Sequence, residues 1–136
     1  MTRPIPRIAR YMSTTPHTIG REQTLSTAHK IMREHRVRHL PVLEGGKLVG
    51  VISDRDLALI ETLRDVDPAK VTVEDAMTQA PYTVSPDTGL DEVVSTMAEH
   101  RYGSAIILDN GNVVGVFTTV DALTALEDLL KARPTH

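Results

Sequence analysis

The sequence predicts a mixed α/β protein made of two similar halves, because one pattern occurs twice along the chain. Residues 12–58 align with residues 77–123 without a gap, 65 positions further on. Each copy contains a short apolar segment, a helix pattern, two apolar runs around a turn and a second helix pattern. Since such a repeat needs its twin to bury its apolar face, we expect two halves packed sheet to sheet about a pseudo-twofold axis, with paired clefts at their junction. Aligned identities include Met12/Met77, Pro16/Pro81, Thr18/Thr83, Leu25/Leu90, Gly50/Gly115 and Asp56/Asp121.

The first half begins with a brief strand over residues 17–19, directly after Pro16. A helix is predicted over residues 24–35, because its apolar residues recur at helical spacing and form one stripe. The second half repeats the stripe 65 positions later. The stripes consist of Leu25, Ala28, Ile31 and Met32 in the first half, and of Leu90, Val93, Val94 and Met97 in the second.

Each helix is followed by a predicted β-hairpin. The turns are Glu44-Gly-Gly-Lys47 and Asp109-Asn-Gly-Asn112, and Asn-Gly favours the positive φ angles of a tight hairpin turn. The flanking strands are apolar throughout rather than alternating, as is typical of strands covered on both faces. Closing helices are predicted over residues 54–63 and 119–132. The predicted strands are residues 40–43 and 48–52 in the first half, and 105–108 and 113–117 in the second.

The boundary between the halves is marked by residues 65–70, which contain Asp67-Pro68 and are interpreted as a linker. Residues 71–77 are predicted to form a short helix, with Thr72 as its N-cap and Asp75 at capping-box spacing. The predicted organisation is a first repeat with its N-terminal segment over residues 1–64, the linker over 65–70, and a second repeat with a C-terminal helix and tail over 71–136.

Composition excludes several classes of protein. The chain has 136 residues, 40% of them hydrophobic, 3% aromatic and none cysteine, so it lacks disulfides, cysteine–zinc sites and the aromatic platforms that bind single-stranded nucleic acid. No apolar run reaches the roughly 20 residues that span a bilayer. Net charge is −3, divided into +4 over residues 1–65 and −7 over residues 66–136. We expect a cytoplasmic protein without membrane insertion, and nucleic-acid binding is not expected.

The clearest chemical motif is Gly50-Val-Ile-Ser53-Asp-Arg-Asp56, which recurs as Gly115-Val-Phe-Thr118-Thr-Val-Asp121. In each copy a strand ends at a hydroxyl residue and a helix begins. Unpaired amides at a helix start favour a phosphate, and the carboxylate three residues later can accept from the vicinal hydroxyls of a ribose. The same spacing is also a capping box, in which the acid serves its own helix. The residues alone leave both interpretations open.

With the repeat, these motifs resemble the tandem cystathionine β-synthase (CBS) domain pair. The likeness extends from about Ile8 to Leu126, and His-Arg-Val-Arg-His-Leu-Pro-Val at residues 35–42 is especially typical. The resemblance implies βαββα repeats in a stand-alone regulatory module that senses energy state or metabolites and is not an enzyme. It also implies an adenine nucleotide in the inter-repeat cleft: AMP, ADP or ATP, with NAD or S-adenosylmethionine as further candidates. A homodimer and a regulated partner protein are implied too, and no cofactor is obligatory.

The resemblance also assigns roles to residues. Asp56 and Asp121 would hold ribose, and Arg38 and His39 would reach the phosphates of the partner repeat's ligand. One site is therefore favoured over its mirror image, where Gly103 and Ser104 replace the basic pair. No metal site is expected, because no histidine or carboxylate cluster has ligand spacing. The expected nucleotide-binding residues are Thr18, Ile19, Arg38, His39, Ser53, Asp56, Tyr82, Thr83, Val84, Ser104, Ala105, Thr118 and Asp121.

A second function also fits these residues. If the capping boxes only cap their helices, the chain is a structural interaction module that dimerises or docks on a partner enzyme or transporter without binding nucleotide. Thermal stability would then not respond to nucleotides. Catalysis is not expected, because the chain has no cysteine nucleophile, no Gly-x-Ser-x-Gly motif and no Walker loop.

Overall fold

The computed structural model describes residues 4–132, which divide into two compact units. The repeat-1 unit contains residues 15–81 and 110–113, and the repeat-2 unit contains residues 4–14, 82–109 and 114–132. Each unit has its own hydrophobic core, and each is built around its own sheet. The predicted mixed α/β class with two sheets is confirmed.

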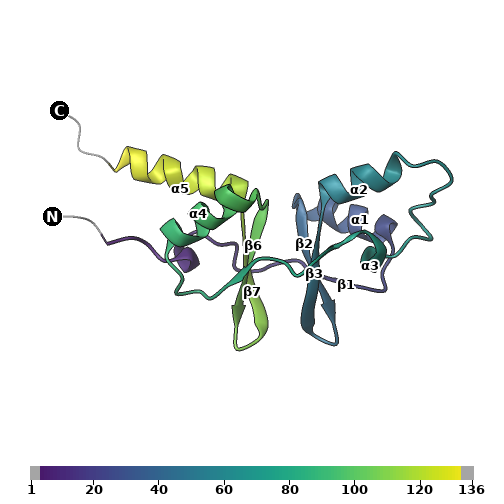
Figure 1. Cartoon of the computed structure of the whole chain (residues 1–136), viewed down its shortest axis with the longest axis horizontal. Helices are drawn as coiled ribbons and strands as arrows, with labels where there is room; N and C mark the ends of the chain where they lie inside the picture. The colour runs from purple at the N-terminus through teal and green to yellow at the C-terminus, as the bar shows by residue number, and fades with distance from the viewer. Residues whose placement is uncertain (1–3, 133–136) are drawn as a thin grey trace. The chain divides into compact units, whose positions relative to one another are not determined.

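The repeat-1 unit is built on a four-stranded sheet in the order β1-β2-β3-β4. Strand β1 runs parallel to β2, and β2 and β3 form the predicted antiparallel hairpin. Helices α1 and α2 lie on one side of this sheet (Figure 1). The elements are β1 (Ile19–Gly20), α1 (Leu25–His35), β2 (His39–Glu44), β3 (Lys47–Ser53), α2 (Asp54–Glu61), α3 (Val73–Ala76) and β4 (Thr78–Gln79).

The repeat-2 unit repeats this plan on a three-stranded sheet in the order β5-β6-β7. Strand β5 is parallel to β6, as β1 is to β2 in the other unit. The elements are the 3₁₀-helix η1 (Ile8–Arg10), β5 (Thr83–Val84), α4 (Leu90–His100), β6 (Ser104–Asp109), β7 (Asn112–Thr118) and α5 (Thr119–Lys131). In both units the helix stripe predicted from the sequence faces the core, with Leu25, Ala28, Met32, Leu90, Val93 and Met97 all buried.

The segment that precedes each repeat packs in the unit of the other repeat. In the repeat-2 unit, Ile8 N donates to Thr88 O at 2.8 Å and Ser13 bridges to Val116. In the repeat-1 unit, Val73 N donates to Gln23 O at 2.8 Å. The compact units therefore cut across the repeat boundaries proposed along the sequence, and those boundaries stay a prediction.

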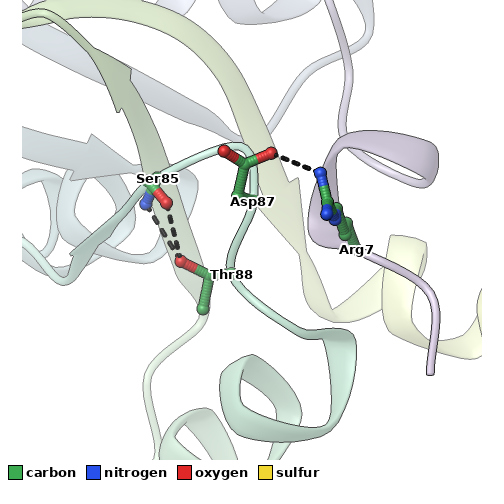
Figure 2. Close-up of polar contacts among 4 residues, drawn as sticks. All are labelled: Arg7, Ser85, Asp87 and Thr88. Carbon is green, nitrogen blue, oxygen red and sulfur yellow. Dashed lines mark hydrogen bonds and ion pairs between the residues drawn. The ribbon is translucent and has the colours of Figure 1, made fainter. Parts of the chain in front are cut away.

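An ion pair strengthens this attachment in the repeat-2 unit. Figure 2 shows the Arg7 guanidinium donating to Asp87 Oδ1 at 2.9 Å, beside a turn in which Ser85 N donates to Thr88 Oγ1 at 3.1 Å. Both charged side chains are largely exposed, so the pair adds at most about 1 kcal/mol. The backbone bonds and buried Ile8 hold the segment in place.

Two glycines permit this docking, because a side chain at either position would collide with the incoming segment. A Cβ on Gly115 would lie 2.6 Å from Met12 Sδ and 2.9 Å from Ser13 O. A Cβ on Gly50 would lie 2.6 Å from Met77 Sδ and 2.8 Å from Thr78 O. The repeated glycine therefore serves close approach of a neighbouring backbone.

The short helix α3 departs from the sequence prediction at its cap. Thr72 does occupy the N-cap position, but its side chain caps no amide. Asp75 N donates to the Thr72 carbonyl at 3.1 Å instead, and the Thr72 hydroxyl donates to the Asp75 carboxylate at 3.2 Å. The expected capping box is wrong here, because the backbone of a single helical turn already uses the amide that the hydroxyl would cap.

Candidate functional site

The repeat-1 unit places a capping box where β3 ends and α2 begins. Asp56 N donates to Ser53 Oγ at 3.2 Å. In return, Asp56 Oδ2 accepts from Ser53 N at 2.9 Å and from Ser53 Oγ at 3.0 Å. Ser53 ends its strand in extended conformation, so its hydroxyl reaches the first turn of the helix. The motif therefore does form a capping box, as one of its two interpretations predicts.

The repeat-2 unit contains the same box with Thr118 in place of the serine. Thr118 N donates to Asp121 Oδ2 at 2.9 Å, and Asp121 N donates to Thr118 Oγ1 at 3.4 Å. In both boxes the carboxylate uses only Oδ2, and within residues 4–132 neither Oδ1 accepts a hydrogen bond. Both aspartates are half-buried. One carboxylate oxygen in each unit is thus available to an external donor.

Arg38 and His39 lie beside the start of α2. His39 pairs with Ser53 across the β2–β3 ladder, and Asp54 N donates to Arg38 O at 2.9 Å. The Arg38 Nε atom is 4.0 Å from Asp54 Oδ2, and the Arg38 side chain is 75% exposed. Such an exposed, distant pair constrains the guanidinium little. The structure therefore gathers Arg38, His39, Ser53 and Asp56 at one end of the repeat-1 sheet.

Thr18 and Ile19 lie one strand further along the same sheet. Ile19 pairs with Val42 on β2, and its side chain is buried in the repeat-1 core. Thr18, directly before it, is half-buried. Only the backbone of Ile19 is therefore available to a ligand, whereas Thr18 keeps part of its side chain at the surface.

The repeat-2 unit gathers the corresponding residues around β5 and β6. Thr83 and Val84 pair with Ile106 and Ile107, and Tyr82 O accepts from Ile106 N at 2.9 Å. Thr83 is exposed, while Tyr82 and Val84 are half-buried. Ser104 and Ala105 begin β6; Ser104 is 8% exposed and the Ala105 side chain belongs to the core. Ala105 thus contributes backbone only.

The expected site residues therefore form two groups, one in each unit. Two further residues escaped the sequence analysis because their contacts are tertiary. Asp54 lies next to Arg38. Its place in the first turn of α2 is the one signal in the sequence that could have suggested this contact. Tyr102 stacks on Tyr82, and nothing in the spacing of these two residues signals that contact.

Two further features are absent from the part of the chain that the structure describes. No group of three or more histidine, cysteine, aspartate or glutamate side chains between residues 4 and 132 is arranged to hold a metal ion. Over the same range, no helix is both long and apolar enough to cross a membrane.

Comparison with known proteins gives both repeats the same relatives. The CBS domain family model matches residues 8–60 and 73–128. The CBS domain-containing protein YhcV of Bacillus subtilis is 32% identical over 110 residues, which cover 81% of this chain and 78% of that protein. Inosine-5'-monophosphate dehydrogenase of Korarchaeum cryptofilum is 31% identical over 105 residues, but these cover only 21% of that enzyme.

The fold has close counterparts among solved structures. The CBS domain pair of protein MJ0100, in complex with 5'-methylthioadenosine and S-adenosyl-L-methionine, superposes with a TM-score of 0.85 at 28% identity. The match covers 93% of this chain and 99% of that one. Because the family model accounts for both repeats and a relative of similar length shares about a third of its residues, the chain belongs to the CBS domain family.

Proposed function

We propose that this chain is a regulatory module that binds an adenine nucleotide or a related adenosine compound. The observation that carries the proposal is the Oδ1 atom of Asp56 and Asp121, which accepts no hydrogen bond from the described residues and recurs at the same place in both units. The described cap uses one carboxylate oxygen, and the vicinal hydroxyls of a ribose can donate to the other. The two adenosine compounds bound by the MJ0100 pair support this class of ligand.

The repeat-2 unit is proposed to hold the nucleoside. Asp121 would accept from the ribose hydroxyls, and exposed Thr83 would lie beside the base. Ser104 is small, whereas the matching position in repeat 1 carries His39. The remaining expected contacts come from Tyr82 and Val84, which flank Thr83, from Ala105, which follows Ser104, and from Thr118 at the end of β7.

The repeat-1 unit is proposed to supply the phosphate contacts. Arg38 is exposed and only weakly held by Asp54, so its guanidinium can turn toward a phosphate at little cost. His39 and Ser53 are paired neighbours at the start of α2, where the helix dipole favours an anion. Asp56, with Thr18 and Ile19, would form a second and weaker nucleoside site, because its mirror-image phosphate positions carry Gly103 and Ser104.

Isothermal titration with AMP, ADP, ATP, NAD and S-adenosylmethionine tests the proposal. The informative variant is Asp121→Asn, which keeps one acceptor oxygen for the cap and replaces the other with an amide that only donates. We expect affinity to fall roughly 10- to 150-fold, the equivalent of about 1.5–3 kcal/mol for hydrogen bonds to a charged group. Asp128→Asn, further along α5, removes the same charge and should leave affinity unchanged. Equal affinity in Asp121→Asn and the unmodified protein would reject this site.

The resemblance further implies that Arg38 and Asp121 serve the same ligand. A double-mutant cycle with Arg38→Ala and Asp121→Asn measures their coupling directly. We expect a coupling energy above about 0.5 kcal/mol with AMP, and none with adenosine, which has no phosphate. Additive losses with AMP would assign the two residues to separate ligands.

Regulation requires that the ligand prefer one conformation or assembly of the chain over another. A ligand shifts such an equilibrium only by its differential affinity for the two states, and coupling of roughly 1–3 kcal/mol is typical. Sedimentation velocity with and without saturating AMP measures a change of assembly. An unchanged distribution, together with unchanged hydrogen exchange, would reduce the proposal to binding without regulation.

A second candidate function, the interaction module, is favoured by the surface of α5. This helix exposes a row of apolar side chains beside a shallow hollow lined by Leu123, Leu126, Glu127, Leu130 and Lys131. The most exposed of these apolar side chains is Leu123, at 65%. We propose that this face contributes to a homodimer. The variant Leu123→Glu should shift the sedimenting species to the monomer, and an unchanged mass would show that α5 is not the interface.

A further inference from the structure

Three aromatic rings form a row on the surface of the repeat-2 unit. The Tyr82 and Tyr102 rings stack with their centroids 5.4 Å apart and an interplanar angle of 28°. Tyr102 also stacks on His100, at 5.2 Å and 15°. Tyr102 therefore links the other two rings, because it stacks on both of them. Tyr82 comes directly before Thr83 of β5, so the row ends next to the proposed nucleoside residues.

The same two positions carry stacked rings in the repeat-1 unit. His17 and His35 align with Tyr82 and His100, and their rings stack directly at 3.7 Å with an interplanar angle of 14°. Val37 stands where the other repeat has Tyr102. A ring before the first strand of each repeat is thus supported by a ring at the end of the following helix, and only the repeat-2 unit adds a third ring that links them.

Two of the three rings lie outside the hydrophobic core, and only Tyr82, which is half-buried, packs against it. His100 is exposed and Tyr102 is 41% exposed, so burial of apolar surface gives little reason for three rings to align. Aromatic pairs in stacked geometry contribute attraction beyond the area they bury, so a flat aromatic group of a ligand can extend such a stack.

The main chain that carries Tyr102 is fixed at the end of helix α4. Arg101 ends α4 in the left-handed conformation at φ 58°, and Tyr102 N donates to Met97 O at 2.9 Å. Tyr82 is held from the other side, because its carbonyl accepts from Ile106 N at 2.9 Å. Tyr102 is thus anchored to helix α4 and Tyr82 to the sheet, and the stack joins the two elements.

We propose that Tyr102 is a positioning residue, which holds the Tyr82 ring in the orientation that stacks on the purine base of the ligand. The inference rests on the proposed function and deepens it. It assigns base recognition to the repeat-2 unit, through Tyr82 as the contacting ring and Tyr102 as its support. The repeat-1 unit lacks the linking ring and should recognise a purine less well.

The variant Tyr102→Val introduces the residue that repeat 1 has at this position, and Tyr102→Phe keeps the ring. Titration calorimetry with AMP and with ribose 5-phosphate separates a role at the base from a general structural role. We expect Tyr102→Val to weaken AMP binding about 2- to 10-fold, the scale of one aromatic stack. Ribose 5-phosphate, which has no base, should bind Tyr102→Val and the unmodified protein equally. Tyr102→Phe should bind AMP like the unmodified protein.

Unchanged AMP affinity in Tyr102→Val would overturn the inference, and so would equal losses for both ligands, which indicate a general loss of structure. These outcomes differ from a failure of the proposed function, in which the unmodified protein binds neither ligand and both ideas fall together. Tyrosine fluorescence gives a second readout, because the chain has no tryptophan and three tyrosines. AMP should quench the emission of Tyr11→Phe, which retains both stacked tyrosines, and quenching should weaken when Tyr102→Val is added.

Discussion

The repeat-1 and repeat-2 units share one backbone plan but differ at the ends of their strands. Both contain a parallel pair, a hairpin, a capping box and a docked leading segment. At the start of β2, repeat 1 has Arg38 and His39, whereas at the equivalent start of β6 repeat 2 has Gly103 and Ser104. Features that hold the fold together recur in both units, while the residues expected to meet a ligand differ. The proposed division of ligand recognition between the two halves rests on this difference.

The largest expected effect tests whether the two cores contribute equally to stability. Phe117 and the equivalent Ile52 are both fully buried, each on the second hairpin strand of its unit. Phe117→Ala should lower the free energy of unfolding by about 3–5 kcal/mol, and Ile52→Ala by about 2–5 kcal/mol. Urea denaturation followed by circular dichroism measures both losses. The exposed Leu59→Ala serves as control and should change stability by less than about 0.5 kcal/mol.

This comparison also reports on cooperativity. If the units unfold together, either variant shifts one common transition. If they unfold separately, each variant shifts only the transition of its own unit. A Phe117→Ala variant as stable as the unmodified protein would contradict the assignment of this residue to the repeat-2 core.

The next effect concerns the docked leading segments. Gly115→Ala and Gly50→Ala should each lower stability by about 1–3 kcal/mol, because the added methyl group overlaps Met12 or Met77 and the adjacent carbonyl. Differential scanning calorimetry measures the change. Adding Met12→Ala to Gly115→Ala should recover only part of the loss, since Ser13 O still lies 2.9 Å from the new Cβ. Full recovery would mean that the methionine side chain, rather than the backbone, limits the approach.

The local parts of the fold were predictable from the sequence. The hairpins and the long helices depend on turn residues and on apolar spacing within a few positions of the chain, and they form as expected. Strand β4 (Thr78–Gln79) was not predicted, because only its pairing with Gly50 and Val51 defines it. The exchange of leading segments escaped for the same reason, since its hydrogen bonds join residues far apart in sequence.

The candidate site shows the same division. The boxes at Asp56 and Asp121 were expected from their spacing, and the structure adds that, among residues 4–132, hydrogen bonds reach only one oxygen of each carboxylate. Ile19 and Ala105 were expected beside a ligand, yet their side chains lie in the cores. Sequence alone cannot tell which face of a short apolar strand a residue occupies when both faces are covered.

The capping boxes offer a comparison of intermediate size. Asp56→Ala and Asp121→Ala should each lower stability by about 0.3–1.5 kcal/mol without nucleotide, because both remove the same hydrogen bonds from a helix start. Thermal melts of the ligand-free variants measure this. With AMP present, the two should diverge if the proposed site is correct, since Asp121→Ala would also lose that site and with it most of the ligand-induced rise in melting temperature. Equal shifts in both variants would indicate two equivalent sites.

The smallest expected effect on stability is at the contact between α1 and α2. In the repeat-1 unit, His29 Nε2 on α1 is 2.5 Å from Glu61 Oε1 on α2, and both side chains are partly exposed. The equivalent positions in repeat 2 are Val94 and Leu126. The double variant His29→Val with Glu61→Leu imports the apolar pair, and it should change stability by less than about 1 kcal/mol, because an exposed pair contributes little.

Each single variant removes one partner and leaves the other in water, so neither strands a buried charge. The coupling energy from the cycle, measured by urea denaturation, should be about 0.2–1 kcal/mol and should fall in 1 M salt, where the Debye length is about 3 Å. A coupling that salt does not weaken would show that the two side chains interact mainly by packing or as a neutral hydrogen bond.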